Sequence, residues 1–216
     1  MIDGATSYPY RDAARRDVQA LVPLAARSLL DVGCGTGMFG RDLLAARPGI
    51  EVWGIDPEPS VNETATTNLS HFVNGFFPAD LPNRRFDCLT FNDALEHFVD
   101  PWDILRRSHD LLTEGATVIA SIPNVRNYGV VRKLVMNGEW EYRDTGILDR
   151  THLRFFTRKS AEAMFRSCGY RLSSVTPLNV AKDGRTVRAL ALLGKRTVEF
   201  RALQFAYVAH PVAKPS

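Results

Sequence analysis

The chain has 216 residues, of which 45% are hydrophobic and 24% are charged. These proportions are those of an ordinary globular protein, and the length suits one domain, so we predict a single domain over residues 1–216. The formal net charge is only +3 and the arginines are interspersed with acidic residues. This excludes the dense basic stripe that is typical of a nucleic-acid-binding protein.

Cysteine usage and apolar patterning limit the class further. Cys34, Cys88 and Cys168 are far apart and odd in number, which argues against a disulfide framework or a zinc knuckle. The first residues include no apolar segment of the kind found in secretory signals. No apolar run approaches the roughly 18 residues needed to span a bilayer. We therefore expect a cytoplasmic protein without a membrane span.

Short apolar runs alternate with helical patterns along the chain, which predicts βαβ units and a parallel sheet. Strands are expected at residues 28–32, 51–55, 71–74, 86–92, 116–122, 170–176 and 203–210. Helices are expected at residues 11–22, 38–47, 60–69, 101–114, 158–168 and 186–200. Three helix starts are marked by capping residues: Ser60 with Glu63, Asp100 followed by Pro101, and Thr157.

Residues 121–157 show no strong periodicity and are rich in arginine and aromatic residues. A connection of this length is unusual in a compact domain and is often functional when it occurs. We expect it to form an insertion or lid over the site.

A glycine-rich loop, Gly33-Cys34-Gly35-Thr36-Gly37, follows the first strand and opens the next helix. Glycines allow a tight turn there, and the helix N-terminus offers unpaired N–H groups to a ligand. The pattern alone is ambiguous, because residues 35–40 also satisfy the GxGxxG fingerprint of dinucleotide-binding folds.

Two acidic residues lie close to this loop. Asp56 ends the second strand, where a carboxylate can hold the ribose hydroxyls of either NAD or S-adenosylmethionine (SAM). Asp31 lies two residues before Gly33, where a carboxylate would attract the ammonium group of SAM and repel a pyrophosphate. Asp31 therefore favours SAM.

The segment Leu29–Gly37 (LLDVGCGTG) resembles motif I of class I SAM-dependent methyltransferases. Further matches follow in the same order: Asp56, residues 86–87 and 92–97 at the fourth strand, and residues 111–115 before the fifth. Two later segments, 121–124 (SIPN) and 149–157 (DRTHLRFFT), resemble a subgroup linked with polysaccharide and glycan biosynthesis. The resemblance implies a Rossmann-like three-layer α/β sandwich with a seven-stranded, mostly parallel sheet whose last strand is antiparallel.

The resemblance also implies SAM as the cofactor and assigns residues to its parts by position. Asp31 and the loop residues Gly33, Cys34, Gly35 and Gly37 would contact the methionine part. Asp56 and Pro57, at the tip of the second strand, would hold the ribose. Asn92 and Asp93, at the end of the fourth strand, would lie beneath the sulfonium. The adenine contact stays open: either Phe76 or Phe77 packs on the ring, or Asp80 reaches its amino group.

For a hydroxyl acceptor, methyl transfer needs a base. His97 follows the fourth strand and is the first candidate, because its ordinary pKa near 6.5 suits proton removal at neutral pH. Its neighbour Glu96 is expected to point elsewhere and to be structural. Asp149 and His152, three residues apart, are the second candidate pair. No metal site is expected, since Asp93, His97, Asp149 and His152 lack compact ligand spacing.

Residues 121–157 are the expected acceptor-binding part, because aromatic faces stack on sugar rings and arginines bind phosphates or carboxylates. The candidate contacts are Asn124, Arg126, Tyr128 and Arg150. Tyr8 and Tyr10 are expected to close over the cofactor. The leading interpretation is methyl transfer from SAM to a hydroxyl of a small polar molecule, such as a sugar or glycan precursor. An N-methyltransferase acting on an amino sugar or small amine, a non-catalytic SAM-binding module and an NAD-dependent oxidoreductase are the alternatives.

Overall fold

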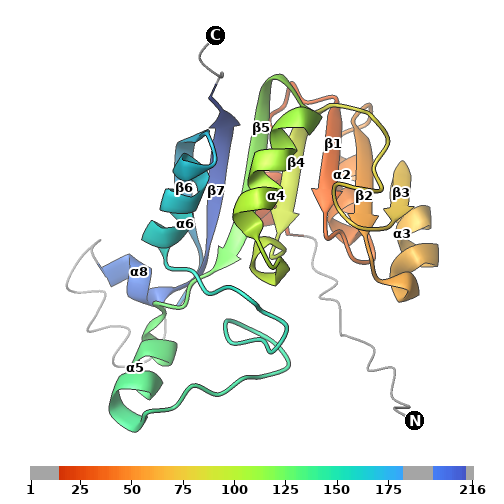
Figure 1. Cartoon of the computed structure of the whole chain (residues 1–216). Helices are drawn as coiled ribbons and strands as arrows, with labels where there is room; N and C mark the ends of the chain where they lie inside the picture. Colours follow the sequence, from red (N-terminus) through yellow and green to blue (C-terminus); the bar gives the residue numbers. More distant parts are fainter. Residues whose placement is uncertain (1–14, 182–196, 213–216) are drawn as a thin grey trace.

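The computed structural model describes residues 15–181 and 197–212, which form a sheet with helices on both of its faces (Figure 1). The sheet has seven strands in the order β3-β2-β1-β4-β5-β7-β6. Strands β1 to β5 are mutually parallel, and β7 is antiparallel to both of its neighbours, β5 and β6. The strands are β1 (Ser28–Val32), β2 (Glu51–Asp56), β3 (His71–Asn74), β4 (Phe86–Asn92), β5 (Leu112–Pro123), β6 (Tyr170–Val180) and β7 (Ala202–Pro211).

Two apolar clusters join the helices to the sheet. One lies under α4 and α6, which cover the front face of the sheet in Figure 1, and the other lies under α1, α2 and α3 on the opposite face. The α-helices in the described ranges are α1 (Arg16–Gln19), α2 (Met38–Ala46), α3 (Asn62–Asn68), α4 (Pro101–Ser108), α5 (Tyr128–Asn137), α6 (Arg158–Ser167) and α8 (Val198–Arg201). This is the predicted three-layer α/β sandwich with an antiparallel last strand.

Two of the three predicted caps are confirmed. The side chain of Asp100 accepts a hydrogen bond from the backbone N–H of Asp103, and Thr157 forms a full capping box with Ser160. The predicted cap at Ser60 is wrong. Glu58 accepts from the Ser60 N–H and opens a 3-10 turn, and α3 starts only after that turn.

The predicted helix over residues 101–114 is too long. The α-helix ends at Ser108, a 3-10 turn covers His109–Leu111, and β5 begins at Leu112, which pairs with Phe86 of β4. Pairing with a buried strand outweighs the helical pattern here, and Gly115 lies within β5 with a φ of 74°.

The segment between β5 and α6 has one helix that its sequence pattern did not predict. Helix α5 begins after Asn127, whose side chain accepts from the Gly129 N–H, and ends at Gly138, which has a φ of 68°. In Figure 1 the segment, coloured green to teal, extends beyond the end of the sheet at which β4 and β5 finish.

Several expectations fall outside the described ranges. Tyr8 and Tyr10 lie outside them, and so do the beginning of the helix predicted at residues 11–22 and most of that at 186–200. Among the described residues, no helix has both the length and the apolar character needed to cross a membrane.

Candidate active site

The glycine-rich loop connects β1 to α2 at the carboxyl end of the parallel strands, where ligands bind in open α/β sheets. Gly33, Gly35 and Gly37 have φ values of 71°, 53° and 77°, a region in which residues with a Cβ atom are strained. A Cβ on Gly37 would also lie 2.9 Å from the Leu69 side chain. The glycines are therefore required both for the turn and for the close packing of α2.

Asp31 is buried at the end of β1, directly before this loop. Its Oδ1 accepts hydrogen bonds from Thr90 Oγ1 at 2.6 Å and from Asn92 Nδ2 at 3.0 Å. The pKa of Asp31 is raised to about 7, chiefly by burial and to a smaller degree by the nearby Asp56 carboxylate, while the two hydrogen bonds oppose this rise. At neutral pH, Asp31 is therefore partly a neutral acid in the free protein. A cation bound beside it would favour the ionised carboxylate.

Asp56 shapes the loop at the tip of β2. One of its oxygens accepts from the Gly35 N–H at 2.9 Å, and the other accepts from the Glu58 N–H at 2.9 Å. The carboxylate therefore connects the two loops between which a ribose would lie, while Pro57 beside it is exposed.

The two residues predicted to lie beneath the sulfonium, Asn92 and Asp93, differ in their contacts. Asn92 donates to Asp31, and its own Oδ1 is buried without a hydrogen-bond partner in the part of the chain that the structure describes. Asp93 has a φ of 51°, and its carboxylate accepts from Arg15, Ser121 and Gln204. Asn92 therefore contacts the buried carboxyl group of Asp31, whereas Asp93 links β5 and β7 to the residue before α1.

On the side where adenine is expected, the two phenylalanines differ in exposure. Phe77 is in the core, with its ring edge-on to Phe91 at 5.9 Å between centroids, whereas 70% of Phe76 is exposed. Asp80 accepts from the Phe76 N–H at 2.7 Å and so holds this turn. Of the two rings, that of Phe76 is the one free to meet a ligand.

The 3-10 turn after β4 (Leu95–His97) places Glu96 and His97 beside His152. A ligand atom from each of the three side chains lies within 4.8 Å of those of the other two. The two histidine rings meet edge to face at 4.8 Å, and His152 Nε2 is 3.9 Å from Glu96 Oε1. The expectation that Glu96 points away from His97 is thus wrong, because the tight turn brings both side chains to one group.

Burial dominates the protonation of this group. It raises the pKa of Glu96 well above its ordinary value and lowers the pKa values of both histidines, which favours the neutral rings. Asp93 and Asp149 act in the opposite direction on the histidines.

His152 reaches this group because its loop is attached to the turn after β4. The carbonyl of Glu96 accepts from the N–H groups of Leu153 and Arg154, and the Arg154 side chain donates to the Val99 carbonyl. The carboxylate of Asp149 accepts from Thr151 at 2.7 Å, and it does not hold the His152 ring by a hydrogen bond. The two predicted base candidates, His97 and His152, are therefore adjacent.

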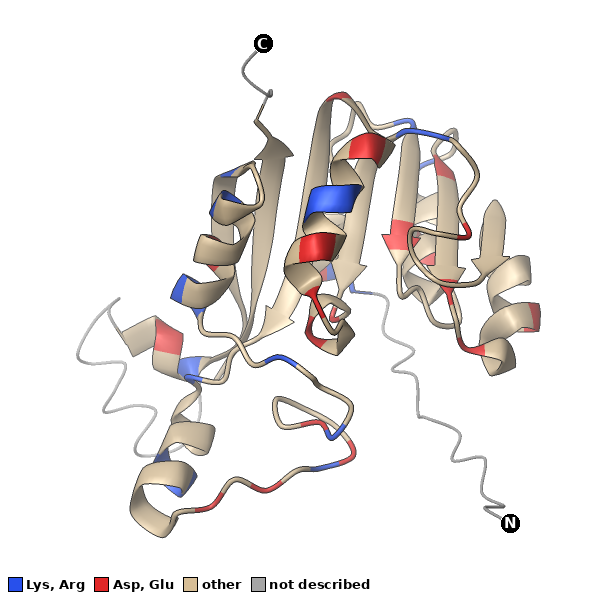
Figure 2. Ribbon diagram, in the orientation of Figure 1, with Lys and Arg blue, Asp and Glu red and all other residues tan. Residues whose placement is uncertain are grey.

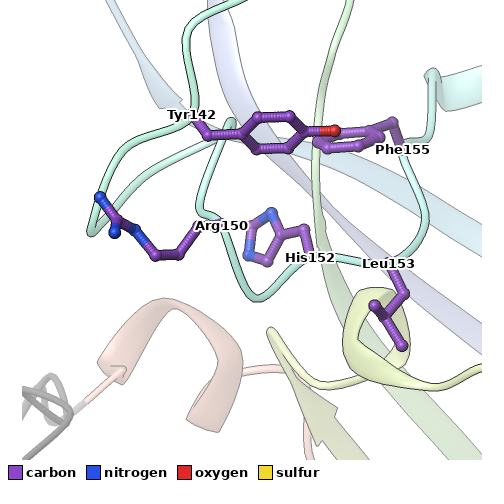
Figure 3. A pocket seen from close by; sticks show the side chains of 5 residues that line it. All are labelled: Tyr142, Arg150, His152, Leu153 and Phe155. Carbon is purple, nitrogen blue, oxygen red and sulfur yellow. The ribbon is translucent and has the colours of Figure 1, made fainter. Parts of the chain in front are cut away.

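An open pocket of about 580 Å³ begins at His152 (Figure 3). Tyr142 and Phe155 lie together on one side, and His152 lies between Arg150 and Leu153. Acidic and basic residues are interspersed along the loop between α5 and α6 (Figure 2), and Arg150 pairs with Asp144 at 2.7 Å. The pocket thus combines aromatic faces, an arginine and a histidine.

Of the four predicted acceptor contacts, only Arg150 lines this pocket. Asn124 is buried and donates to the carbonyls of Glu199 and Ala202, and Arg126 pairs with the Glu199 carboxylate. Tyr128 begins α5. Asn124 and Arg126 therefore hold the chain against α8. Tyr142 and Phe155 also line the pocket, in line with the stacking role expected of the aromatic residues in this segment.

Comparison with known proteins agrees with this geometry. Residues 9–175 match the family model described as a methyltransferase domain. Because the match covers most of the chain, the protein belongs to this family, within the class I SAM-dependent methyltransferases. SAM is the cofactor of this class, as predicted.

Individual relatives are more distant. An uncharacterized methyltransferase of Mycobacterium tuberculosis is 34% identical over 118 residues, which are 51% of this chain and 59% of that protein. A ubiquinone biosynthesis O-methyltransferase of Cereibacter sphaeroides is 30% identical over 138 residues, which are 59% of this chain and 53% of that protein. The chain thus spans less than two thirds of the length of these relatives.

The fold also matches solved structures. The crystal structure of a SAM-dependent methyltransferase from Archaeoglobus fulgidus superposes with a TM-score of 0.66 at 17% identity, covering 91% of each chain. The predicted fold is confirmed. The subgroup linked with glycan biosynthesis stays a prediction.

Proposed function

We propose that this protein transfers the methyl group of SAM to a hydroxyl group of a small polar acceptor, such as a sugar or glycan precursor. The observation that carries the proposal is the His97–His152 pair, which lies between the carboxyl end of β4 and the open pocket. The name of the Cereibacter sphaeroides relative, an O-methyltransferase, also favours oxygen as the methylated atom.

The donor side is built from the glycine loop and two carboxylates. The buried carboxyl group of Asp31 would receive the ammonium of SAM, and Asp56 would bind the ribose hydroxyls. The exposed ring of Phe76 offers a face for adenine. With SAM held by these residues, its sulfonium would face the end of β4 and the histidine pair.

The acceptor side is supported by the pocket's composition. Tyr142 and Phe155 line the pocket with ring centroids 6.2 Å apart, and Trp140 packs against Phe155, with its centroid 5.2 Å from that of Phe155. Aromatic rings of this kind stack on the apolar faces of sugars, and the guanidinium of Arg150 offers donors to phosphate or carboxylate. A polar sugar derivative fits this combination.

The reaction is an in-line displacement, in which the protein mainly positions the acceptor. A lone pair of the acceptor oxygen forms a bond to the methyl carbon, and the carbon–sulfur bond breaks with its electron pair going to sulfur. The products are the methyl ether and S-adenosylhomocysteine. The hydroxyl proton must leave, and an Nε2 lone pair of the histidine pair is placed to accept it.

The test is methyl-acceptor profiling with labelled SAM, preceded by calorimetry with SAM and S-adenosylhomocysteine. We expect SAM to bind in preference to NAD, and label to appear on oxygen of a sugar-type acceptor. His97→Ala should lower turnover by about 100-fold or more while leaving SAM affinity unchanged. Label on nitrogen, or unimpaired turnover of the variant, would contradict the proposal, and NAD binding alone would remove it.

A further inference from the structure

Glu96 has an environment that a buried carboxyl group rarely has. Only 1% of the residue is exposed, and among residues 15–181 and 197–212 no other residue donates a hydrogen bond to either carboxyl oxygen. Burying a carboxylate without donors is costly, so native proteins pair such groups or use them to bind a cation. His152 Nε2, which lies 3.9 Å from Glu96 Oε1, is too distant for a hydrogen bond.

Both histidines beside Glu96 present a free lone pair. Nδ1 of His152 lies 3.1 Å from the Ile147 carbonyl, and Nδ1 of His97 lies 3.3 Å from the Thr151 carbonyl. A carbonyl oxygen can only accept, so Nδ1 carries the hydrogen in each ring and Nε2 does not. Fixing the ring through Nδ1–H to a carbonyl is the arrangement that surrounds metal-binding histidines.

We propose that Glu96, His97 and His152 bind a divalent transition-metal cation that in turn binds the acceptor oxygen. The inference rests on the proposed O-methyl transfer and changes the role of the two histidines from proton acceptor to metal ligand. Two imidazoles and one carboxylate select Zn²⁺, Mn²⁺, Fe²⁺ or Co²⁺ over Mg²⁺ and Ca²⁺, which prefer oxygen ligands.

The distances suit one ion after a small adjustment. At metal–ligand distances of about 2.1 Å, neighbouring ligand atoms lie roughly 3.0–3.5 Å apart. The three side chains already hold their ligand atoms within 4.8 Å of each other, so a closure of about 1 Å completes the site. Asp149 adds negative charge nearby, whereas the charge of Asp93 is partly offset by its ion pair with Arg15.

Three protein ligands leave a position open for substrate, as in catalytic zinc sites. His152 is a ligand and also lines the pocket, so the open position can face the acceptor. Coordination makes the acceptor hydroxyl more acidic, its proton passes to water, and the oxygen attacks the SAM methyl carbon. The carbon–sulfur electron pair remains on sulfur, as in the metal-free scheme.

The test is direct cation binding to the full chain, without SAM or acceptor. The protein is treated with a chelator, dialysed and titrated with Co²⁺, whose visible absorption reports nitrogen ligation, and then with Zn²⁺ in competition. We expect one Co²⁺ per chain. Glu96→Gln and His152→Ala should each weaken it by about 100-fold or more.

His71→Ala is the matched control, because His71 also lies beside a carboxylate, Glu51 at 2.9 Å, but on the protein surface. It should bind Co²⁺ like the unmodified protein. Circular dichroism verifies folding of each variant, and if one variant fails to fold, the other decides. Absence of stoichiometric Co²⁺ binding, or equal affinity in a folded Glu96→Gln or His152→Ala variant, overturns the metal site.

The two proposals fail in different ways. Methyl transfer to oxygen that is unaffected by chelator, in a protein that binds no Co²⁺, removes the metal and leaves the proposed function. Cation binding that requires Glu96 and His152, in a protein that transfers no methyl group from SAM, supports the site and removes the function.

Discussion

The protonation of Asp31 is set by its burial beside the glycine-rich loop. Its pKa is raised to about 7 from an ordinary value of 3.8, chiefly because the carboxyl group is buried. In the folded protein the neutral acid is therefore favoured up to neutral pH, whereas in the unfolded chain the group ionises near pH 4. Its contribution to stability is present below about pH 4 and is lost as the pH rises through about 7.

Asp31→Asn should remove this loss of stability at higher pH, and it should also weaken SAM binding. The free energy of unfolding of the variant, relative to the unmodified protein, should increase by about 1–3 kcal/mol between about pH 4 and about pH 8. Urea titrations at both pH values measure this. SAM affinity at about pH 8 should fall about tenfold or more, because the ammonium loses its carboxylate.

Asp42→Asn is the control, since Asp42 is a surface acid of α2 paired with Arg41. It should alter neither the pH dependence nor SAM binding. Parallel pH profiles of the Asp31 variant and the unmodified protein would show that burial does not control this carboxyl group.

At the residue scale, the positions of the glycine loop, Asp31 and Asp56 follow from a local sequence pattern, because these residues are close in sequence to the strand ends that position them. The position of Glu96 beside His97 did not follow from such a pattern. Its contact with His152 depends on the long connection between β5 and α6 folding back onto the turn after β4. The signal available was the pair Glu96-His97 directly after a buried strand.

Among the elements, α6 illustrates how local chemistry fixes a helix start. The Thr157 side chain accepts from the Ser160 N–H, and the Ser160 side chain accepts from the Thr157 N–H. Thr157→Ala should therefore lower the free energy of unfolding by about 1 kcal/mol, measured by urea or thermal unfolding. Thr64→Ala, on the exposed side of α3, should change it by less than about 0.5 kcal/mol. Equal effects of the two changes would count against the cap.

Prediction of the elements succeeded where a local signal and the tertiary contacts agreed. Strands β1, β2 and β4 are mostly buried and rich in apolar residues, because both faces of a parallel sheet are covered. Prediction failed at the start of β5, where pairing with β4 overrides a helical pattern, and at α5. None of the residues of α5 is buried, and its apolar residues include the exposed Leu134, Val135 and Met136, so packing against the core does not explain this helix.

For the whole molecule, the order of strands did not follow from periodicity. Alternating patterns predicted a parallel sheet, but the antiparallel β7 came from the resemblance of the motifs to a known family. The physical reason is that β7 pairs with β5 and β6 through backbone groups, which every sequence provides. Side chains that connect distant segments specify the arrangement of the elements more closely than backbone pairing does.

Asp93 is one such side chain, because its carboxylate joins segments from the beginning, middle and end of the chain. It pairs with Arg15 at 2.6 Å and accepts from Ser121 at 2.9 Å and Gln204 at 3.0 Å. Removing a partly buried, charge-assisted hydrogen-bond group costs about 2 kcal/mol, and alanine at a φ of 51° adds strain. Asp93→Ala should therefore lower the free energy of unfolding by about 2–3 kcal/mol.

Asp93→Asn separates the charge from the other contributions of this residue. The amide keeps an oxygen for Ser121 and, like aspartate, tolerates the left-handed backbone, so this variant should lose only about half as much as Asp93→Ala. Added salt should narrow the difference between Asp93→Asn and the unmodified protein, because it screens the ion pair with Arg15. Urea titrations at low and high salt measure both effects, and Asp110→Ala, at an exposed acid, gives the baseline. If the two Asp93 variants lose equal stability at every salt concentration, the Arg15 ion pair accounts for the whole effect, and the links to β5 and β7 contribute nothing.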